Sequence, residues 1–523
     1  TGTAQTGAIR ALVHNEFQIA QTFGDAFTDT TAGAGVGYSA AAGGASQAAC
    51  SGGDDRPFLV CNTLPFARRA LAAVTVWDWT GDEDEIAFTT QEGKPLRSTV
   101  VERSREPYWD HRYIKALVEL DLPPGGGRIV HAVRSAAAKP DHRFHVYGED
   151  DWLVERERVY VLENEHLRIE FDAQTLLIRR IYDKTDGTDL IDTDQRCGPR
   201  VVVEEAHHMS SWVTGRYVSD AAAERTRIVE YRRKPDELVQ WITVEYLFGD
   251  STVRLRYELA LGATVLRIDG AVEWRETGRK GEHIPQLLFR VPTVSETSRY
   301  RYAVPAGVIE RDSADQDRPS SSFIVPVEYR NGNERTSARK LQLIGDGQYG
   351  FRGTPRAMSV SLLRSSVDPD PVPECGNHRF HLSLAVVEED TPGAQTRAAR
   401  TAAHPPVVLS LTAGTITKRG TLEPESFSLF SVEPNAVDVL SIHGAGDGSA
   451  FVVRVSEMNG KPARVTVTAP RDIERALFTD AFERETLAEM NVPPIVVDGP
   501  TATFSLAAYR IATLKLYLRD ETE

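Results

Sequence analysis

The sequence predicts a mainly β protein made of antiparallel β-sandwich domains, one of them a large super-sandwich. Apolar and polar residues alternate along many short segments, most clearly over residues 253–261, and this period of two is typical of strands with one buried face. Turn-forming Gly, Pro, Asn and Asp separate these segments, as at residues 123–127 and 459–460. A parallel sheet would require crossover helices at regular intervals, and no such series of helical patterns is present.

Changes in composition divide the chain into a lead-in and three β regions. The lead-in is rich in Ala, Gly, Thr and Ser, and its frequent Gly residues lower its helix propensity, so we expect it to be poorly ordered or partly helical. Passages rich in Ala and Pro mark the later boundaries. The expected parts are a lead-in at 1–55, a first β-sandwich at 56–140, a super-sandwich at 150–395 and a small C-terminal β-sandwich at 405–523.

The charge pattern argues against nucleic acid as a partner. The formal net charge is −15, with acidic and basic residues interspersed along most of the chain. Basic residues form only short clusters, such as Arg232, Arg233 and Lys234, whereas binding to a polyanion needs an extended basic surface. A neutral substrate fits this composition better.

Cysteine usage and the lack of targeting signals indicate a cytoplasmic location. The four cysteines, Cys50, Cys61, Cys197 and Cys375, form no C-x-x-C pair, and the sequence has no Asn-x-Ser/Thr glycosylation site. Reduced thiols are the rule in the cytoplasm. The sequence also has no stretch of 18 apolar residues and no basic start followed by an apolar run, so we expect neither membrane anchoring nor export.

Several motifs appear in a fixed order from residue 56 to the end of the chain. The motifs lie at residues 56–68, 162–172, 178–184, 260–274, 305–311, 358–378, 454–460 and 509–516. In that order and spacing they resemble the C-terminal, post-catalytic region of glycoside hydrolase family 38 α-mannosidases. Each motif is short, and it is their joint order that makes the resemblance specific.

The resemblance implies a retaining glycosidase whose Asp nucleophile and zinc ion lie in an N-terminal (β/α)₇ barrel. In such enzymes a helical bundle follows the barrel, and a His near the start of the bundle binds the zinc. The nearest passage here, residues 23–29, has Gly24 at that position, which is either a lost ligand or a different register of the motif. Asp25 is then an ordinary surface residue. The chain begins Thr-Gly-Thr, and we expect an upstream piece to carry the barrel.

This chain is therefore expected to hold no catalytic residue and no metal, with zinc confined to the missing catalytic domain. Glycoside hydrolysis needs two carboxyl groups on a rigid scaffold, and no such pair is recognisable here. Alone, the chain should be inactive. Two functions stay open: the β-sandwich portion of an enzyme that hydrolyses α-mannosides together with a barrel, or a non-catalytic carbohydrate-binding or scaffolding protein.

The loop at residues 368–378 is the predicted contact with substrate. Its prolines stiffen the backbone, so Asp368, Asp370 and His378 would lose little entropy when they hydrogen-bond to sugar hydroxyls. The alternative is a connection between two core strands, in which the Asp side chains cap turns.

Glu204, Glu205, His207 and His208 have the composition of a metal cluster. Adjacent histidines on a strand point to opposite faces, however, and cannot bind one ion unless the backbone turns. This region ends near Trp212 and resembles a family segment that precedes a sheet strand, so the resemblance favours a packing role for the region over metal binding.

A second group of aromatic residues comprises Trp77, Trp79, Trp109 and Tyr113. Their flat apolar faces could stack on a pyranose ring. Packing in the core or between domains is the more frequent use of such residues, and both interpretations stay open.

Overall fold

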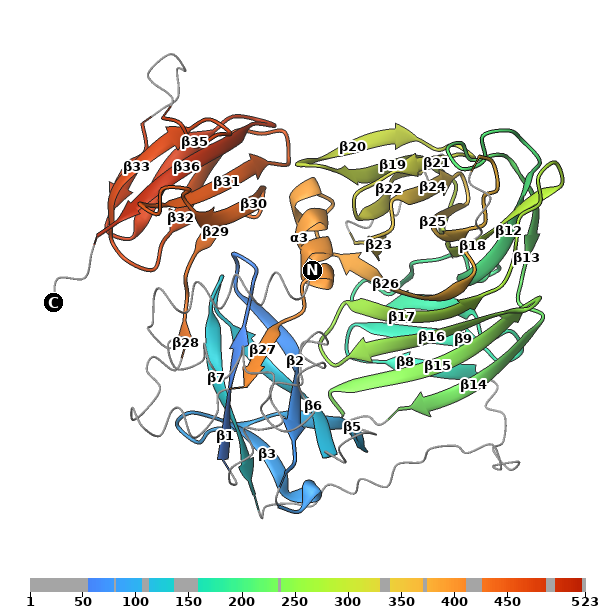
Figure 1. The fold of residues 1–523 in the computed structure, drawn as a ribbon, viewed down its shortest axis with the longest axis horizontal. Coiled ribbons are helices and arrows are strands. Elements are labelled where there is room, and N and C mark those ends of the chain that lie inside the picture. The colour runs from blue at the N-terminus through green and yellow to red at the C-terminus, as the bar shows by residue number, and fades with distance from the viewer. Residues whose placement is uncertain are drawn as a thin grey trace.

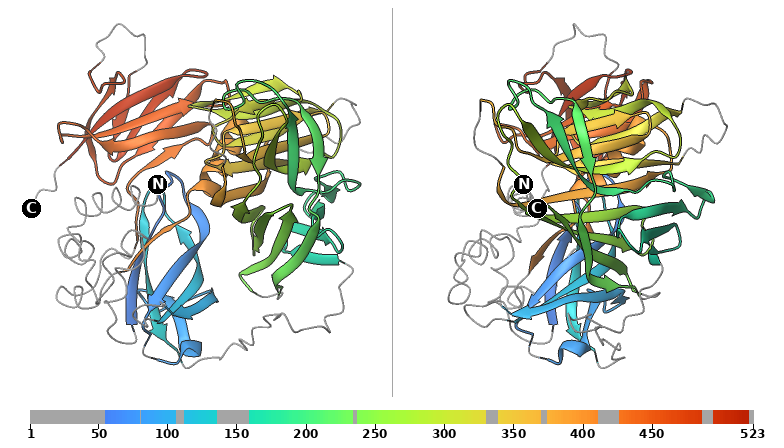
Figure 2. Two further views of the ribbon diagram at one scale, coloured as in Figure 1. Left: turned by 45° about the vertical axis from the view of Figure 1, so that its right-hand side comes forward. Right: turned by 90° about the vertical axis from the view of Figure 1, so that its right-hand side faces the viewer.

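The structure is a computed structural model of the chain. It describes residues 55–79, 81–105, 112–135, 159–233, 237–329, 339–369, 374–410, 426–485 and 494–519. Figures 1 and 2 show three groups of sheets arranged around a single labelled helix, α3 (Pro392–Ala403).

The first group consists of two packed antiparallel sheets near the start of the chain. Alternating apolar residues of both sheets meet in one core, which includes Phe58, Val74 and Ile114. A short 3-10 turn, η3 (Glu83–Glu85), precedes β3. One sheet has the order β27 (Val407–Ser410), β1 (Asp55–Cys61), β7 (Gly127–Arg134), β3 (Ile86–Thr90) and β4 (Pro95–Leu96), with β28 (Ser426–Phe427) also on β7; the other has the order β2 (Arg68–Trp77), β6 (Arg112–Leu122) and β5 (Ser98–Arg105).

Two strands of the first group come from far along the chain. β27 pairs with β1, with Val60 opposite Val408, and β28 pairs with β7. Both strands lie within residues 405–523, the range predicted to form the C-terminal sandwich. The sequence pattern did not predict this pairing, because an edge strand of four residues is too short for its pattern to indicate which strand it pairs with.

The middle of the chain forms three sheets that enclose a large common core. The four-stranded sheet has the order β11 (Thr188–Asp189), β10 (Ile178–Asp183), β9 (Leu167–Asp172) and β8 (Val159–Glu163). The six-stranded sheet has the order β13 (Tyr217–Ala221), β12 (Gly198–Glu205), β18 (His283–Pro292), β25 (Ala357–Arg364), β24 (Gly350–Thr354) and β21 (Asp317–Pro319). The nine-stranded sheet has the order β14 (Arg225–Arg232), β15 (Val239–Phe248), β16 (Ser251–Ala260), β17 (Val265–Trp274), β26 (Gly376–Val387), β23 (Lys340–Asp346), β22 (Phe323–Tyr329), β19 (Thr297–Val304) and β20 (Gly307–Asp312).

The alternation predicted over residues 253–261 is present in β16. Val253, Leu255 and Tyr257 are fully buried, while the residues between them are less buried. On the neighbouring strands, Gly270 of β17 lies opposite Phe380 of β26, and a Cβ atom at Gly270 would lie 2.2 Å from the Phe380 ring. Glycine is therefore required there by the close approach of an aromatic ring.

The last group is a sandwich of two four-stranded sheets. Its core combines residues of both sheets, among them Val453, Val465 and Leu514. One sheet has the order β29 (Ser431–Glu433), β32 (Ala463–Thr468), β35 (Thr501–Leu506) and β34 (Val496–Asp498); the other has the order β30 (Val437–Gly444), β31 (Phe451–Glu457), β36 (Ile511–Leu518) and β33 (Ile473–Thr479).

Helix α3 starts at a Thr391 N-cap, whose side chain accepts a hydrogen bond from the Ala394 amide.

The predicted fold class is confirmed: the described residues form antiparallel sandwiches that include a super-sandwich. The lead-in predicted at 1–55 lies outside the described residues except for its last one, Asp55, which begins β1. The four domain ranges themselves stay predictions.

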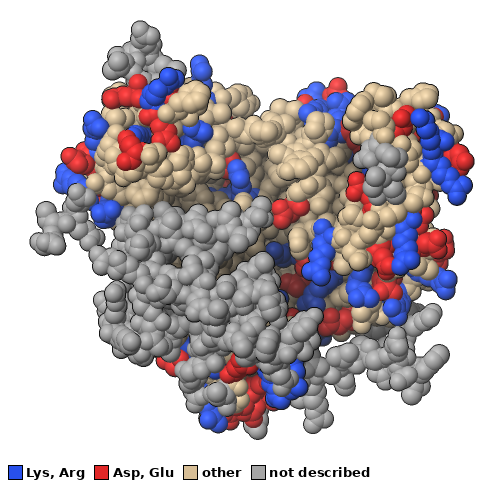
Figure 3. Space-filling model, in the orientation of Figure 1, with Lys and Arg blue, Asp and Glu red and all other residues tan. Residues whose placement is uncertain are grey.

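No helix in the described ranges combines the length and apolar character that crossing a bilayer requires. On the face shown in Figure 3, acidic and basic side chains lie intermingled wherever the described residues are visible.

Candidate functional site

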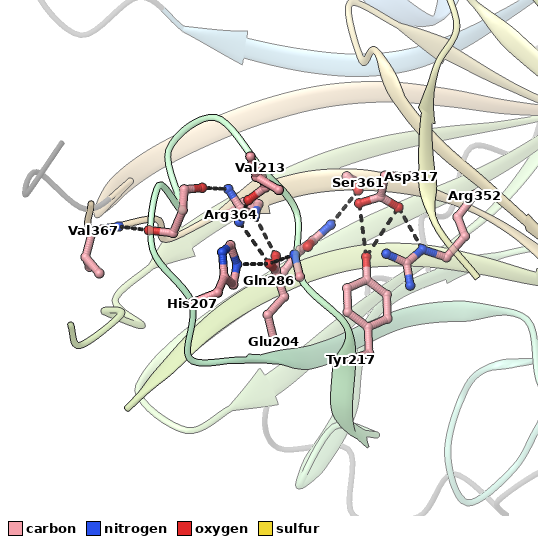
Figure 4. Close-up of polar contacts among 12 residues, drawn as sticks. Glu204, His207, Val213, Tyr217, Gln286, Asp317, Arg352, Ser361, Arg364 and Val367 are labelled. Carbon is pink, nitrogen blue, oxygen red and sulfur yellow. Dashed lines mark hydrogen bonds and ion pairs between the residues drawn. The ribbon is translucent and has the colours of Figure 1, made fainter. Parts of the chain in front are cut away.

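The candidate site is built on a loop, residues 206–216, that joins β12 to β13 and folds over the outer face of the six-stranded sheet. Its base is the buried carboxylate of Glu204 at the end of β12. One oxygen of Glu204, Oε2, accepts hydrogen bonds from the Gly215 amide at 2.5 Å and lies 3.1 Å from Nε2 of His207. Figure 4 shows this carboxylate between His207 and Arg364. The two ends of the loop are thereby tied to one acid.

Arg364, from the end of β25, holds the loop from the other side. Its Nε and Nη2 donate to Glu204 Oε1 and Oε2 at 2.5 and 2.9 Å, in a bidentate pair. The same guanidinium donates to the carbonyl oxygens of Ser210 and Val213. Burial alone would raise the pKa of Glu204, but the bonds from Arg364 and the Gly215 amide bring this pKa below its ordinary value. The acid is therefore ionised and used for structure.

Ser210 joins this loop to the turn that follows β25. Its side chain is fully buried, and its Oγ accepts hydrogen bonds from the amides of Val367 and Asp368 at 3.1 and 3.0 Å. In return, the Ser211 amide donates to the Asp368 carbonyl at 2.8 Å. The two loops thus form one rigid unit.

The tip of the rigid unit presents an exposed aromatic ring. Trp212 is 70% exposed, and its neighbours Met209 and Val213 are also exposed. The amides of Trp212 and Val213 both donate to the Met209 carbonyl, which closes a tight turn in which Met209 has a φ of 61°. An exposed indole offers a flat apolar face to a ligand. Because the turn that carries it is anchored, little backbone entropy is lost when a ligand binds.

Polar side chains surround this platform on the Asp368 side. Asp368 Oδ2 accepts from the Met209 amide at 3.2 Å and lies 3.6 Å from Nδ1 of His208, and Oδ1 lies 3.7 Å from Nζ of Lys280. The Met209 amide, and after it Lys280 and His208, lower the pKa of Asp368. His208 and Lys280 are strongly exposed. The exposed ring, together with a loop junction that carries a carboxylate, an imidazole and an ammonium group, can bind a sugar by stacking and hydrogen bonds.

A second polar network continues along the same face (Figure 4). The guanidinium of the buried Arg352 lies 3.5 Å from the ring centroid of Tyr217 and donates to Asp317 at 2.8 Å. Tyr217 also donates to Asp317. Burial, and after it the charge of Asp317, raises the pKa of Tyr217. Arg352, Tyr217 and Asp317 contact one another and brace β13, so we assign them a structural role.

The three predicted contact residues have different outcomes. Asp368 lies in the site, with its side chain at the junction of the two loops. Asp370 lies outside the described residues. His378 lies near the start of β26, opposite Val272, where its Nε2 contacts the Glu374 carbonyl at 2.7 Å. Among the described residues no hydrogen bond joins His378 to Asp368, so only Asp368 is placed in the candidate site.

The residues with the composition of a metal cluster do not fit a metal. Both oxygens of Glu204 are engaged by Arg364, Gly215 and His207, and His208 turns away toward Asp368. Within the described ranges no group of three His, Cys, Asp or Glu side chains could hold an ion. Gly24, in the passage that resembles the family's zinc motif, lies outside the described residues. We derive no chemistry through zinc here.

Glu204, at the start of this region, is buried, but sequence reasoning missed the exposure of Trp212 at its end. Sequence reasoning also missed Arg364 and Ser210, because their partners lie more than 150 residues away in the chain. Trp77 contacts Tyr113 with ring centroids 4.9 Å apart, and Arg56 lies over the Trp79 ring, so these aromatics pack within the first group of sheets. Trp109 lies outside the described residues.

The fold and the site define a class: a tandem β-sandwich protein with a super-sandwich whose loops present a rigid polar and aromatic surface. Residues 162–372 match the family model described as the glycosyl hydrolases family 38 C-terminal domain. This match confirms the resemblance to the C-terminal region of family 38 enzymes that was found from the sequence motifs.

Two solved structures share the fold over most of the chain. One is a protein in the glycosyl hydrolase family 38 from Enterococcus faecalis, with a TM-score of 0.66, 12% identity, and coverage of 90% of this chain and 59% of that chain. The other is an alpha-mannosidase from Enterococcus faecalis V583, with a TM-score of 0.65, 12% identity, and coverage of 92% and 59%. This chain therefore spans 59% of the length of each relative. No curated protein matches the chain.

Proposed function

We propose that this chain is the β-sandwich portion of an α-mannosidase-like glycoside hydrolase, which acts on α-mannosides only together with a catalytic barrel. The observation that carries the proposal is the family match over residues 162–372, together with the shared fold of two family 38 structures over at least 90% of the chain. In this proposal the barrel supplies the nucleophile and the zinc, and hydrolysis proceeds with retention.

The sandwiches contribute a carbohydrate-binding surface in this proposal. Trp212 provides the stacking face, while Asp368, His208 and Lys280 provide hydrogen-bonding groups around it. The bonds from Arg364 and Ser210 fix the geometry before a sugar arrives, so little ordering is needed on binding. A mannoside is neutral and rich in hydroxyl groups, which can both donate and accept hydrogen bonds. It therefore suits a surface that carries acidic and basic side chains together.

The location that we propose is the cytoplasm. Cys61, Cys197 and Cys375 are free thiols, and burial raises the pKa of the Cys61 thiol to about 12. Unpaired cysteines of this kind agree with a reducing compartment.

The test has two arms, both on the 523-residue chain. The first is an assay with 4-nitrophenyl α-mannoside, with and without zinc, for the chain alone and after it is joined to the upstream segment of its gene. We expect turnover only in the joined protein. Turnover by the chain alone would overturn the division of labour, and an inactive joined protein would overturn the assigned activity.

The second arm measures binding of methyl α-mannoside by calorimetry. Trp212→Ala should weaken binding about tenfold, the equivalent of losing one stacked ring. Phe482→Ala is the matched control, because Phe482 is an exposed aromatic residue of the C-terminal sandwich that also lies beside an arginine, Arg484. Equal affinities for Trp212→Ala and the original chain would remove Trp212 from the site.

A further inference from the structure

A cavity lies away from the Trp212 loop, between the first group of sheets, the helix α3 and the C-terminal sandwich. Its volume is about 420 Å³. Three elements enclose it: the β1–β2 connection with Cys61 and Phe66, the helix α3 with Arg397, and the start of the C-terminal sandwich with Phe430 and Leu440. Most of the lining is apolar, and a cavity of this size accommodates a small organic molecule.

Arg397 gives the cavity its chemical character. Its guanidinium lies 3.7 Å from the ring centroid of Phe66 and donates to the side-chain oxygen of Asn435. Among the described residues no ion pair joins Arg397 to a carboxylate. Burial lowers the pKa of Arg397, and the field of Glu433 only partly opposes this effect. A half-buried cation whose nearest acceptor is a neutral amide is incompletely compensated.

The adjacent arginine on the same helix provides the contrast. Arg400 also lines the cavity, and its Nη2 donates to Asp438 at 3.0 Å in an ion pair. The same wall of the cavity thus holds one arginine with an acid and one without. The pKa of His404, one turn further, is lowered first by burial and then by the charges of Arg400 and Arg68, whereas Asp346 and Asp438 oppose this effect.

We propose that this cavity binds a small organic anion, with an oxyanion head on Arg397 and an apolar body against Phe66, Phe430 and Leu440. A carboxylate or phosphate head would accept two parallel hydrogen bonds from the planar guanidinium of Arg397, which otherwise donates to Asn435. The body would occupy the space between the first group of sheets, α3 and the C-terminal sandwich. The ligand would therefore stabilise the junction at α3, independently of any sugar at Trp212.

The experiment uses the full chain and three probes: benzoate, phenyl phosphate and inorganic phosphate. Benzoate and phenyl phosphate share a body and differ in the head, whereas inorganic phosphate has no body. We expect saturable binding of benzoate or phenyl phosphate by calorimetry and a rise in melting temperature, because a ligand of the native state raises stability. Inorganic phosphate should bind at least about tenfold more weakly.

Two variants test the role of Arg397 while keeping the fold measurable. Arg397→Gln removes the charge, and Asn435→Asp supplies an internal carboxylate at the same bond. Both should weaken probe binding at least about tenfold, and Asn435→Asp should keep or raise the melting temperature without ligand. Arg475→Gln is the control, because Arg475 stacks on Tyr517 outside the cavity, and it should bind as the original chain does.

The outcomes separate clearly. Binding of at least one aromatic probe that both variants lose and the control keeps supports the proposal. No saturable binding of any probe overturns it, as does binding that survives Arg397→Gln or Asn435→Asp. If inorganic phosphate binds as tightly as the aromatic probes, the part of the proposal that assigns an apolar body to the ligand is overturned. None of these results depends on mannoside turnover, so failure here leaves the proposed glycosidase role untouched.

Discussion

Arg364 and Glu204 form a bidentate ion pair at the centre of the candidate site, with N–O distances of 2.5 and 2.9 Å. The pair joins β25 to β12 by side chains that are 17% and 0% exposed. Through Arg364 it also fixes the carbonyls of Ser210 and Val213. The shape of the loop that carries Trp212 therefore depends on one buried charge pair.

The first prediction concerns the strength of this pair. Arg364→Met leaves the Glu204 carboxylate buried without its main partner, so the free energy of unfolding should fall by about 3 to 5 kcal/mol. The double variant Arg364→Met with Glu204→Gln should lose less than the sum of the two single changes, since no unpaired charge is then left. Urea unfolding measures both values. Arg279→Gln, which breaks an exposed pair with Glu282, should change stability by about 0.5 kcal/mol or less.

The second prediction is a pH dependence of stability. The folded pKa of Glu204 lies below its ordinary value of 4.5, so its contribution is complete above that value and is lost as the pH falls toward the folded pKa. Stability of the original chain should therefore decrease between about pH 5 and pH 3. Arg364→Met should show a shallower decrease in urea unfolding over the same range. Equal slopes would mean that Arg364 does not set the ionisation of Glu204.

The third prediction separates the exposed tryptophan from a buried one. Trp212→Ala should change the free energy of unfolding by about 0.5 kcal/mol or less, because its ring is 70% exposed. Trp274→Ala should cost about 3 to 5 kcal/mol, because Trp274 is fully buried and its Nε1 donates to Ser365 at 2.8 Å. Thermal or urea unfolding of both variants provides the measurement. A large loss in Trp212→Ala would show that the ring is packed.

The fourth prediction concerns the junction of the two loops. Ser210→Ala leaves the amides of Val367 and Asp368 without their acceptor and should cost about 1 to 3 kcal/mol. Hydrogen exchange of these two amides should also accelerate. Ser449→Ala, in an exposed turn of the C-terminal sandwich, is the control and should leave both readouts unchanged. Unchanged exchange in Ser210→Ala would mean that other contacts hold the loops together.

The fifth prediction tests the close approach of Phe380 to Gly270. Gly270→Ala places a methyl group 2.2 Å from the ring and should destabilise the protein by about 1 to 3 kcal/mol. Gly444→Ala should be close to neutral, because no atom lies within 4 Å of its added Cβ. The comparison is made by thermal unfolding. Equal melting temperatures would indicate that β17 and β26 can separate at little cost.

The sequence predicted the sheets well because the signal for a half-buried strand is local. The alternation of Val253, Leu255 and Tyr257 needs no knowledge of the partner strand, and the structure buries all three. The candidate site was predicted only through Asp368. The burial of Glu204 and the exposure of Trp212 both depend on Arg364, whose position beside them is set by strand pairing across the super-sandwich. No local pattern encodes that pairing.

The return of β27 and β28 to the first sheet has a consequence for biosynthesis. β1 leaves the ribosome early, whereas the strand that covers its edge emerges on the order of tens of seconds later at typical rates of elongation. During that interval one side of β1 can pair with another nascent chain. A chaperone that shields this edge, or a pause in translation before residue 407, would govern the yield of correctly folded molecules.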